Sequence, residues 1–227
     1  MHCKKSSRGW ILVAGAVMAL VLPSAASASV VSLWHMDETS GTTMRDSVGP
    51  NNGTLTNVAL GLPGFSNRAF GFNGSSSIVK VPNSASLFLG ASDFTVTLHV
   101  KFAAVPSAAV GDYDLIRRGL SSSTGGDWKI EILPRDSGTT GRASCHASGS
   151  VGSSTSTNGP NLADNAWHTL TCIKRASSLT LVVDGVAYAK SATIGSITNT
   201  SQLTIGAKIS SGDWYGGLMD EVSFSKP

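Results

Sequence analysis

Apolar and polar residues alternate along much of this chain with the period of a β-strand. In the segment 94–102, Phe, Val, Leu, Val and Phe occupy every second position, and Thr, Thr, His and Lys fill the positions between them. Successive side chains of a strand point to opposite faces, so this pattern predicts a strand with one buried face. Similar short runs recur at 69–74, 77–81, 114–118, 128–133, 167–175, 179–184, 187–190, 203–206 and 215–224.

Helical patterns are almost absent from the sequence. The one helix-like piece, residues 83–87, is long enough for a single 3₁₀ turn. Asp184-Gly185 separates two predicted strands and is typical of a two-residue hairpin turn, because both positions need a positive φ. A chain with roughly a dozen strands and short turns is predicted to be all-β: a two-sheet antiparallel β-sandwich with six or seven strands in each sheet.

The segments 31–41 and 214–224 resemble each other. Each is a short apolar strand that carries an Asp-Glu pair, Asp37-Glu38 in the first and Asp220-Glu221 in the second. Pairing the first strand with the last would hide two sheet edges, so we expect these segments to lie side by side. Such a pairing would bring acidic groups from both ends of the chain together.

Residues 1–28 have the pattern of a secretory signal peptide. Lys4, Lys5 and Arg8 precede an apolar run of 13 residues, and Ala26-Ser27-Ala28 resembles a cleavage site. The run is shorter than the ~20 residues that span a bilayer, although an uncleaved anchor is the alternative interpretation. We therefore predict a secreted, extracellular protein in which residues 29–227 form one domain.

Charge further limits the choice of partners. The leader holds three of the 17 basic residues and none of the 14 acidic ones, so the remainder is electrically balanced. This balance and the absence of long basic clusters argue against a nucleic-acid partner. No membrane partner is expected either, and we expect a monomer.

Two cysteines remain after removal of the leader. Cys145 and Cys172 lie in predicted strands, and two cysteines in an oxidising compartment usually pair. The alternatives are two buried thiols or a zinc site with His146 and His168, although the cysteines lack the CxxC spacing of most zinc sites. We predict a disulfide.

Several short motifs, weak one by one, carry a family resemblance through their order. They are Leu33-Trp34-His35-Met36-Asp37-Glu38, Asn52-Gly53-Thr54-Leu55, Ala69-Phe70-Gly71-Phe72-Asn73-Gly74, Trp167-His168-Thr169-Leu170, Leu181-Val182-Val183-Asp184-Gly185 and Gly217-Leu218-Met219-Asp220-Glu221-Val222. With them, residues 29–227 resemble the laminin G-like branch of the concanavalin A-like lectin/glucanase jelly rolls. The resemblance implies a jelly-roll fold that commonly binds carbohydrate or glycoprotein, is sometimes enzymatic and often carries calcium. A Cys145–Cys172 pair is also similar to secreted bacterial members.

The resemblance also implies a place for structural calcium. In related jelly rolls the ion lies where the terminal strands meet, and Asp220 matches the ligand in the final strand motif. Asp37 and a backbone carbonyl at the Asn73-Gly74 turn are the other candidate ligands, since calcium prefers several oxygen ligands. The alternative is that these carboxylates cap turns by accepting backbone N–H bonds.

The sequence gives little support for catalysis. Glycosidases on a related jelly roll carry Glu-x-Asp-x-x-Glu along one strand, and this pattern is missing. Glu38, Glu131 and Glu221 lie in three separate regions. No motif of a serine hydrolase, zinc protease or nucleotide-binding loop is present either. We predict a non-enzyme and keep a cryptic glycoside hydrolase as the weakest alternative.

Sugar binding requires aromatic platforms and polar groups that fix hydroxyls. Trp34, Trp128 and Trp167 fit core positions, which leaves Trp214 as the best exposed platform. The remaining candidate sugar contacts are Asp213 beside it, Arg117, Lys129 and Glu131 on one sheet face, and Asp127 and Asn158 on rim loops. A solvated outer face is the alternative interpretation. The predicted function is binding of a polysaccharide or glycoconjugate; the rival is an extracellular protein-interaction or surface-structural module.

Overall fold

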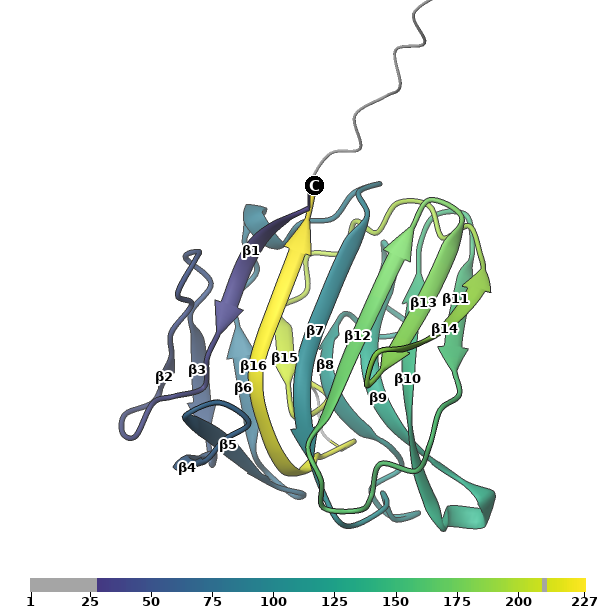
Figure 1. Cartoon of the computed structure of the whole chain (residues 1–227). Helices are drawn as coiled ribbons and strands as arrows, with labels where there is room; N and C mark the ends of the chain where they lie inside the picture. Colours follow the sequence, from purple (N-terminus) through teal and green to yellow (C-terminus); the bar gives the residue numbers. More distant parts are fainter. Residues whose placement is uncertain (1–27, 210–211) are drawn as a thin grey trace, which may run out of the picture.

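The computed structural model describes residues 28–209 and 212–227 as a sandwich of two antiparallel eight-stranded sheets (Figure 1). The predicted leader, residues 1–28, lies outside the described part except for its last residue. The first sheet, sheet A, has the order β14-β13-β12-β7-β16-β5-β4, and β1 also pairs with β16. The second, sheet B, has the order β11-β10-β9-β8-β15-β6-β3-β2. The predicted sandwich is confirmed, with more strands than expected.

The elements have the following bounds. Sheet A contains β1 (Ser29–Trp34), β4 (Ala59–Pro63), β5 (Arg68–Asn73), β7 (Phe94–Lys101), β12 (His168–Arg175), β13 (Ser178–Val183), β14 (Val186–Ser191) and β16 (Gly216–Lys226). Sheet B contains β2 (Thr43–Met44), β3 (Gly53–Thr56), β6 (Ile78–Val81), β8 (Tyr113–Arg118), β9 (Asp127–Arg135), β10 (Thr140–Ser148), β11 (Ser153–Thr157) and β15 (Leu203–Ile205). Two short 3₁₀ turns are η1 (Ala85–Leu87), where the sequence predicts one, and η2 (Asp136–Gly138).

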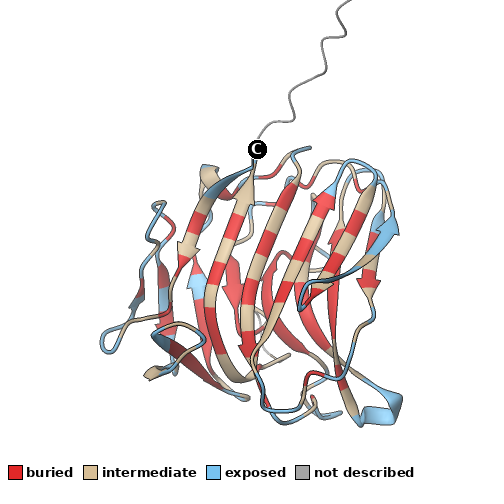
Figure 2. Ribbon diagram, in the orientation of Figure 1, coloured by how far each residue is buried: buried red, intermediate tan, exposed pale blue. Residues whose placement is uncertain are grey.

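The core lies between the inner faces of the two sheets. Strand β7 is buried at every second residue, and Figure 2 shows the same alternating bands along β16 and β12. Trp34, Trp128 and Tyr215 are among the largest fully buried side chains, as the sequence predicts for the two tryptophans. Trp167 corrects one expectation: it is only half-buried, because it precedes β12 and lies outside the inner face.

Strand β16 joins the two ends of the chain. Its one edge pairs with β7, and its other edge is shared by β5 at the start of β16 and β1 at its end. Trp34 lies opposite Val222 in this ladder. The expected pairing of the first strand with the last is therefore confirmed (Figure 1).

A β-bulge interrupts β16 at Asp220 and Glu221. The register against β7 shifts between Asp220 and Ser223, and Glu221 has a φ of 47°. Met219 and Val222 on either side both belong to the core, so the bulge places two consecutive carboxylates on the outer side of the strand.

The Cys145–Cys172 disulfide links strand β10 of sheet B to strand β12 of sheet A. Both cysteines are fully buried, so the predicted bridge holds the two layers together from within the core. The predicted hairpin at Asp184-Gly185 joins β13 to β14, with φ values of 48° and 83°. Within residues 28–209 and 212–227, no helix has the length and apolar character needed to cross a bilayer.

Candidate functional site

Polar side chains cross the outer face of sheet B in two rows. The first row runs Asp114, Glu131, Ser144 and Thr157, on β8, β9, β10 and β11. The second runs Thr204, Arg117, Lys129, His146 and Thr155, on β15, β8, β9, β10 and β11. Trp128, Ile130 and Ile132 of β9 are buried in the core, so Lys129 and Glu131 between them must face outward. The alternation of β9 thus fixes which charged groups reach this face.

A cavity of about 670 Å³ opens over these rows. Its lining combines strand residues with residues of the loops around them: Gly111, Asp112, Arg117, Leu120, Ser121, Ser122, Asp127, Lys129, Leu133, Pro134, Arg135, His146, Lys208 and Asp213. Beneath it, Glu131 is only 4% exposed and Asp114 is fully buried, although both lie on the outer side of the sheet. The cavity therefore has charged walls and a charged floor.

Lys129 is the centre of the ion pairs in this cavity. Its Nζ atom contacts Glu131 Oε2 and lies 3.3 Å from Asp112 Oδ2 and 3.7 Å from Asp114 Oδ1. Arg117 binds the other oxygen of Asp114 and donates its Nε–H to the Gly119 carbonyl at 2.9 Å. These contacts hold the polar groups in fixed positions, which is what a ligand site requires.

Several buried polar atoms of this face have no hydrogen-bond partner among residues 28–209 and 212–227. They include Asp114 Oδ1, Ser144 Oγ and Thr204 Oγ1. Buried polar atoms are normally paired with protein or water. All three residues belong to the two polar rows, but none of them is among the residues that line the cavity.

The surroundings of the carboxyl groups in the cavity shift their pKa values. Burial, together with a hydrogen bond to Asp112, raises the pKa of Glu131 to about 8. Burial would also raise the pKa of Asp112, but its bonds to Glu131 and Lys129 lower it below the usual value. Burial and the nearby Asp112 charge raise the pKa of Asp213. Glu131 therefore holds its proton to a higher pH than an ordinary glutamate, whereas Asp112 loses its proton at a lower pH than an ordinary aspartate.

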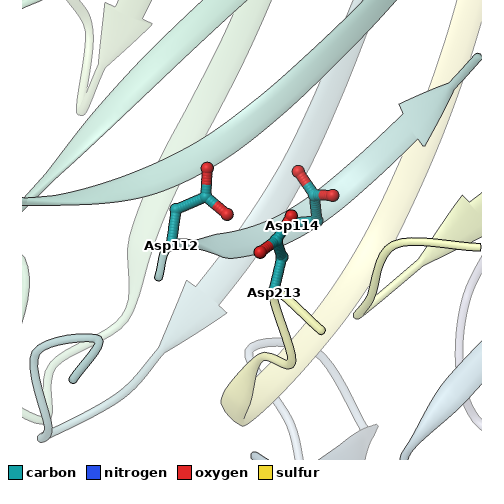
Figure 3. Close-up of side chains that lie close together, drawn as sticks. All are labelled: Asp112, Asp114 and Asp213. Atoms are coloured by element: carbon teal, nitrogen blue, oxygen red, sulfur yellow. The ribbon is translucent and has the colours of Figure 1, made fainter. Parts of the chain in front are cut away.

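Three carboxylates in the cavity approach one another closely enough to suggest a cation site. Atoms of Asp112, Asp114 and Asp213 lie within 4.8 Å of one another, and Figure 3 shows them converging from β8 and from the loop before β16. Ammonium groups already neutralise this cluster, since Lys129 lies among its members and Lys208 Nζ is 3.2 Å from Asp213 Oδ2. We therefore do not assign a metal ion to it.

Most of the sequence-predicted sugar contacts are brought together here. Asp213, Arg117, Asp127 and Lys129 line the cavity, and Glu131 lies beneath it in contact with Lys129. Asp127 belongs to β9 itself, whereas the sequence placed it on a rim loop.

Two predicted contacts lie elsewhere. Trp214 follows Asp213 in the chain but is half-buried and does not line the cavity. Asn158 lines a different hollow beside β11 and β14, because the β10–β11 hairpin carries it past the edge of the charged rows. The expected Trp platform at this face is therefore corrected: no tryptophan in the described part of the chain lines the cavity, whose lining combines charged and hydroxyl groups with Leu120, Leu133 and Pro134.

Asp112 and Asp114 are functional candidates that sequence reasoning missed. They alternate around Tyr113 at the start of β8, and Tyr113 is a core residue, so the pattern itself could have placed both carboxylates outward. The proximity of Asp213 was harder to foresee. It depends on the loop before β16, where the Asp114 N–H donates to the Asp213 carbonyl at 2.9 Å.

The residues predicted to bind calcium do not form one site. Asp220 accepts N–H bonds from Ser66 at 2.8 Å and from Glu221 at 2.9 Å, and Asp37 accepts one from Arg68 at 2.9 Å. Gly74 lies near Gly216 at the other end of the β5–β16 ladder, four residues away from Asp220 along β16. The three residues do not fit a calcium ion as a set, and Asp37 and Asp220 instead anchor the turn before β5.

Removal of divalent cations should therefore leave the melting temperature unchanged. The carboxylate oxygens of Asp220 already have N–H partners, so no bound ion is needed to stabilise the folded state. The melting temperature is measured by thermal unfolding in free EDTA and in EDTA that has been saturated with calcium. A melting temperature that falls only with the free chelator would show that the folded protein does bind such an ion.

Solved structures similar to this chain share its fold at low sequence identity. Domain 4 of AbnA, a GH43 extracellular arabinanase from Geobacillus stearothermophilus solved with arabinotriose, matches with a TM-score of 0.66 and 16% identity, over 88% of this chain and 93% of that domain. The binding domain of Paraclostridial Mosquitocidal Protein 1 matches with a TM-score of 0.67 and 17% identity, and the binding domain of botulinum neurotoxin serotype G with 0.63 and 13%. The chain covers about half of each toxin domain, 48% and 47%.

Comparison with curated protein sequences finds no match to this chain. A laminin G-type family model, described as the concanavalin A-like lectin/glucanases superfamily, matches residues 73–226, from the end of β5 through β16. This range contains nearly all of the cavity-forming strands and both cysteines. The chain therefore belongs to the concanavalin A-like lectin/glucanase superfamily, as a laminin G-like member.

Proposed function

We propose that this protein is a secreted, non-catalytic carbohydrate-binding protein that holds its glycan in the cavity over sheet B. The cavity itself carries the proposal. Its volume lies in the range of small-ligand sites, and its lining supplies cations, carboxylates and serine hydroxyls from a rigid sheet and three bordering loops. Sugar hydroxyls both donate and accept hydrogen bonds, so they match a surface in which the two kinds of group alternate.

Secretion is part of the proposal and has two supports. The leader pattern of residues 1–28 is one. The second is the disulfide between Cys145 and Cys172, because such bonds persist mainly in oxidising compartments.

The carboxyl geometry favours binding over glycoside hydrolysis. Glycosidases place two carboxyls about 5 Å or more apart, so that both can reach opposite sides of the scissile bond. Here Lys129 Nζ contacts both Glu131 and Asp112. The ammonium group of Lys129 occupies the space between these two carboxyl groups and offsets their charge, and we therefore propose no catalytic step.

A protein-binding role is the rival interpretation, and it would favour a continuous apolar surface. Among residues 28–209 and 212–227, the exposed large hydrophobic residues belong to six different segments of the chain: Val30, Val48, Phe65, Phe88, Val151 and Val186. These positions do not supply a continuous apolar surface from one segment of the chain, whereas the cavity gathers its charged groups in one place. We therefore prefer the carbohydrate-binding role to the protein-binding role.

Asp213→Asn is expected to weaken glycan binding about tenfold, because charge-assisted hydrogen bonds are the stronger kind. The matched control is Asp136→Asn: both aspartates have a positive φ, which Asn tolerates, and both pair with a cation. Asp136 does not line the cavity over sheet B. A glycan array followed by calorimetry measures the effect. Arabinotriose belongs in the panel because domain 4 of AbnA was solved with it.

Two results would contradict the proposal. One is an absence of binding by the wild-type protein across the array. The other is a loss of affinity that is equal in the Asp213→Asn and Asp136→Asn variants, since this would mean that the cavity has no special role.

A further inference from the structure

The turn between β4 and β5 is fastened to the outer face of sheet A. Asp220 accepts the Ser66 N–H at 2.8 Å, and Asp37 accepts the Arg68 N–H at 2.9 Å. Asp220 is fully buried, and its burial raises its pKa to about 6. Burying a carboxylate is costly unless it is well hydrogen-bonded, so this anchoring holds the turn in one conformation.

Phe65 lies at the tip of this turn and presents an open aromatic ring. The ring stacks on His99 of β7, with centroids 3.8 Å apart and planes 12° from parallel. Trp167 meets it edge-on at 6.2 Å. The Phe65 side chain is nevertheless 52% exposed, so one face of the ring is covered by His99 and the other faces solvent.

Polar groups lie around His99, on which the ring stacks: Thr169 is opposite His99 on β12, and Asp220 is opposite it on β16. Glu221 binds His35 Nδ1 at 2.9 Å, and His99 Nδ1 lies 3.0 Å from the hydroxyl of Thr169. The Thr169 N–H in turn donates to Asp184 at 2.8 Å. Apart from Trp167, the groups placed here are carboxylates, imidazoles and hydroxyls. This surface therefore differs from an apolar protein interface, in which neighbouring side chains would extend the apolar area.

We propose that Phe65, supported by His99, is a platform on which a sugar ring of a polysaccharide chain stacks, with Glu221 and Asp184 as partners for its hydroxyls. The apolar C–H face of a sugar matches an aromatic face, while its rim of hydroxyls matches the polar surroundings. This platform is on the opposite side of the sandwich from the cavity and stands independently of it. Together the two sites would let one molecule contact two stretches of polysaccharide.

The platform is preorganised in two respects. The turn is held by Asp220 and Asp37, so little chain entropy is lost when the ligand binds. Burial lowers the pKa of His99, which keeps the imidazole under Phe65 neutral near pH 7 and leaves the stack uncharged.

The experiment measures depletion of the full-length protein by insoluble arabinan, xylan, cellulose and chitin. On the polysaccharide that retains the wild-type protein, Phe65→Ala should lower the association constant by about 3- to 10-fold. This is the effect of losing one stacking contact. Phe65→Leu should lose as much, because it keeps apolar volume without a flat ring, and Phe65→Trp should restore retention. Phe88→Ala is the matched control, since Phe88 is the other strongly exposed phenylalanine in the part of the chain that the structure describes, at 41%.

The outcomes separate this proposal from the cavity. The platform proposal would be overturned if a polysaccharide retained the Phe65→Ala or Phe65→Leu variant as well as the wild-type protein. It would also be overturned if none of the four polysaccharides retained the wild-type protein. Asp213→Asn reports on the cavity alone. If Asp213→Asn weakens the binding of arabinotriose while Phe65→Ala is retained in full by the polysaccharide, the cavity proposal is supported and the platform proposal is wrong. If Asp213→Asn binds arabinotriose as wild type does while Phe65→Ala loses retention, the platform proposal is supported. Circular dichroism of each variant checks the fold.

Discussion

Trp34→Ala is expected to lower the free energy of unfolding by about 3–5 kcal/mol, the range for removing a large aromatic side chain from a core. Trp34 is fully buried on β1, and its Nε1–H donates to the Asn51 carbonyl at 2.7 Å. The substitution leaves a cavity where β1 packs beside β16 and also leaves a buried carbonyl without its donor. Urea unfolding followed by circular dichroism measures the change.

Val30→Ala is the matched control on the same strand. Val30 is 46% exposed, so its truncation should change stability by less than about 0.5 kcal/mol. If Trp34→Ala cost no more than Val30→Ala, β1 would not be docked as an integral part of the sandwich, and the pairing of the two chain ends would be in error.

Removal of the disulfide has the second large effect. The bond closes a separation of 27 residues, so the Cys145→Ala/Cys172→Ala variant should lose about 3 kcal/mol through the greater freedom of its unfolded chain. The loss should be aggravated by the cavities left at two fully buried positions that join opposite sheets. Chemical denaturation of the oxidised protein and of the double variant gives this difference.

Reduction of the wild-type protein provides the internal comparison for this prediction. A reductant should shift the wild-type denaturation midpoint toward that of the double variant and leave the double variant unaffected. Equal midpoints for the reduced and oxidised wild-type protein would mean that the bond between the sheets contributes nothing measurable to stability.

Local sequence patterns predicted the parts of the fold that depend on neighbouring residues. The alternation along 94–102 placed β7, and Asp184-Gly185 placed the β13–β14 hairpin, because both signals act over a few residues. The two Asp-Glu strands at the chain ends indicated one long-range pairing, which the register of Trp34 against Val222 confirms.

The site was only partly predictable because it depends on how loops cover the sheet. Lys129 and Glu131 could be placed outward from the alternation of β9. By contrast, the sequence predicted that both Asp213 and Trp214 would be exposed at the binding face. Only the path of the loop before β16 decides that Asp213 lines the cavity and Trp214 does not. Trp167 shows the same limit, since its apolar neighbours suggested the core whereas it lies half-buried beside Phe65.

The cavity over sheet B and the Phe65 platform on sheet A share one feature. In each, a buried carboxylate holds the residues above it in position. In the cavity, Asp114 is fully buried under Lys129 and Arg117, and on the other face Asp220 is fully buried under the Phe65 turn. Buried carboxylates contribute little net stability, so their clearest effect here is to hold other groups in place. On each outer face, a buried carboxylate therefore fixes the groups that we propose to contact a ligand.

The most direct test of the central claim is a hydrogen–deuterium exchange footprint with the glycan that the array identifies, used as a soluble oligosaccharide. Binding in the cavity predicts slower exchange in the loops that border it, around Leu120–Ser122 and Asp213, and in β8 and β9 beneath it. Slower exchange that spares these segments and appears only on other parts of the molecule would contradict the account.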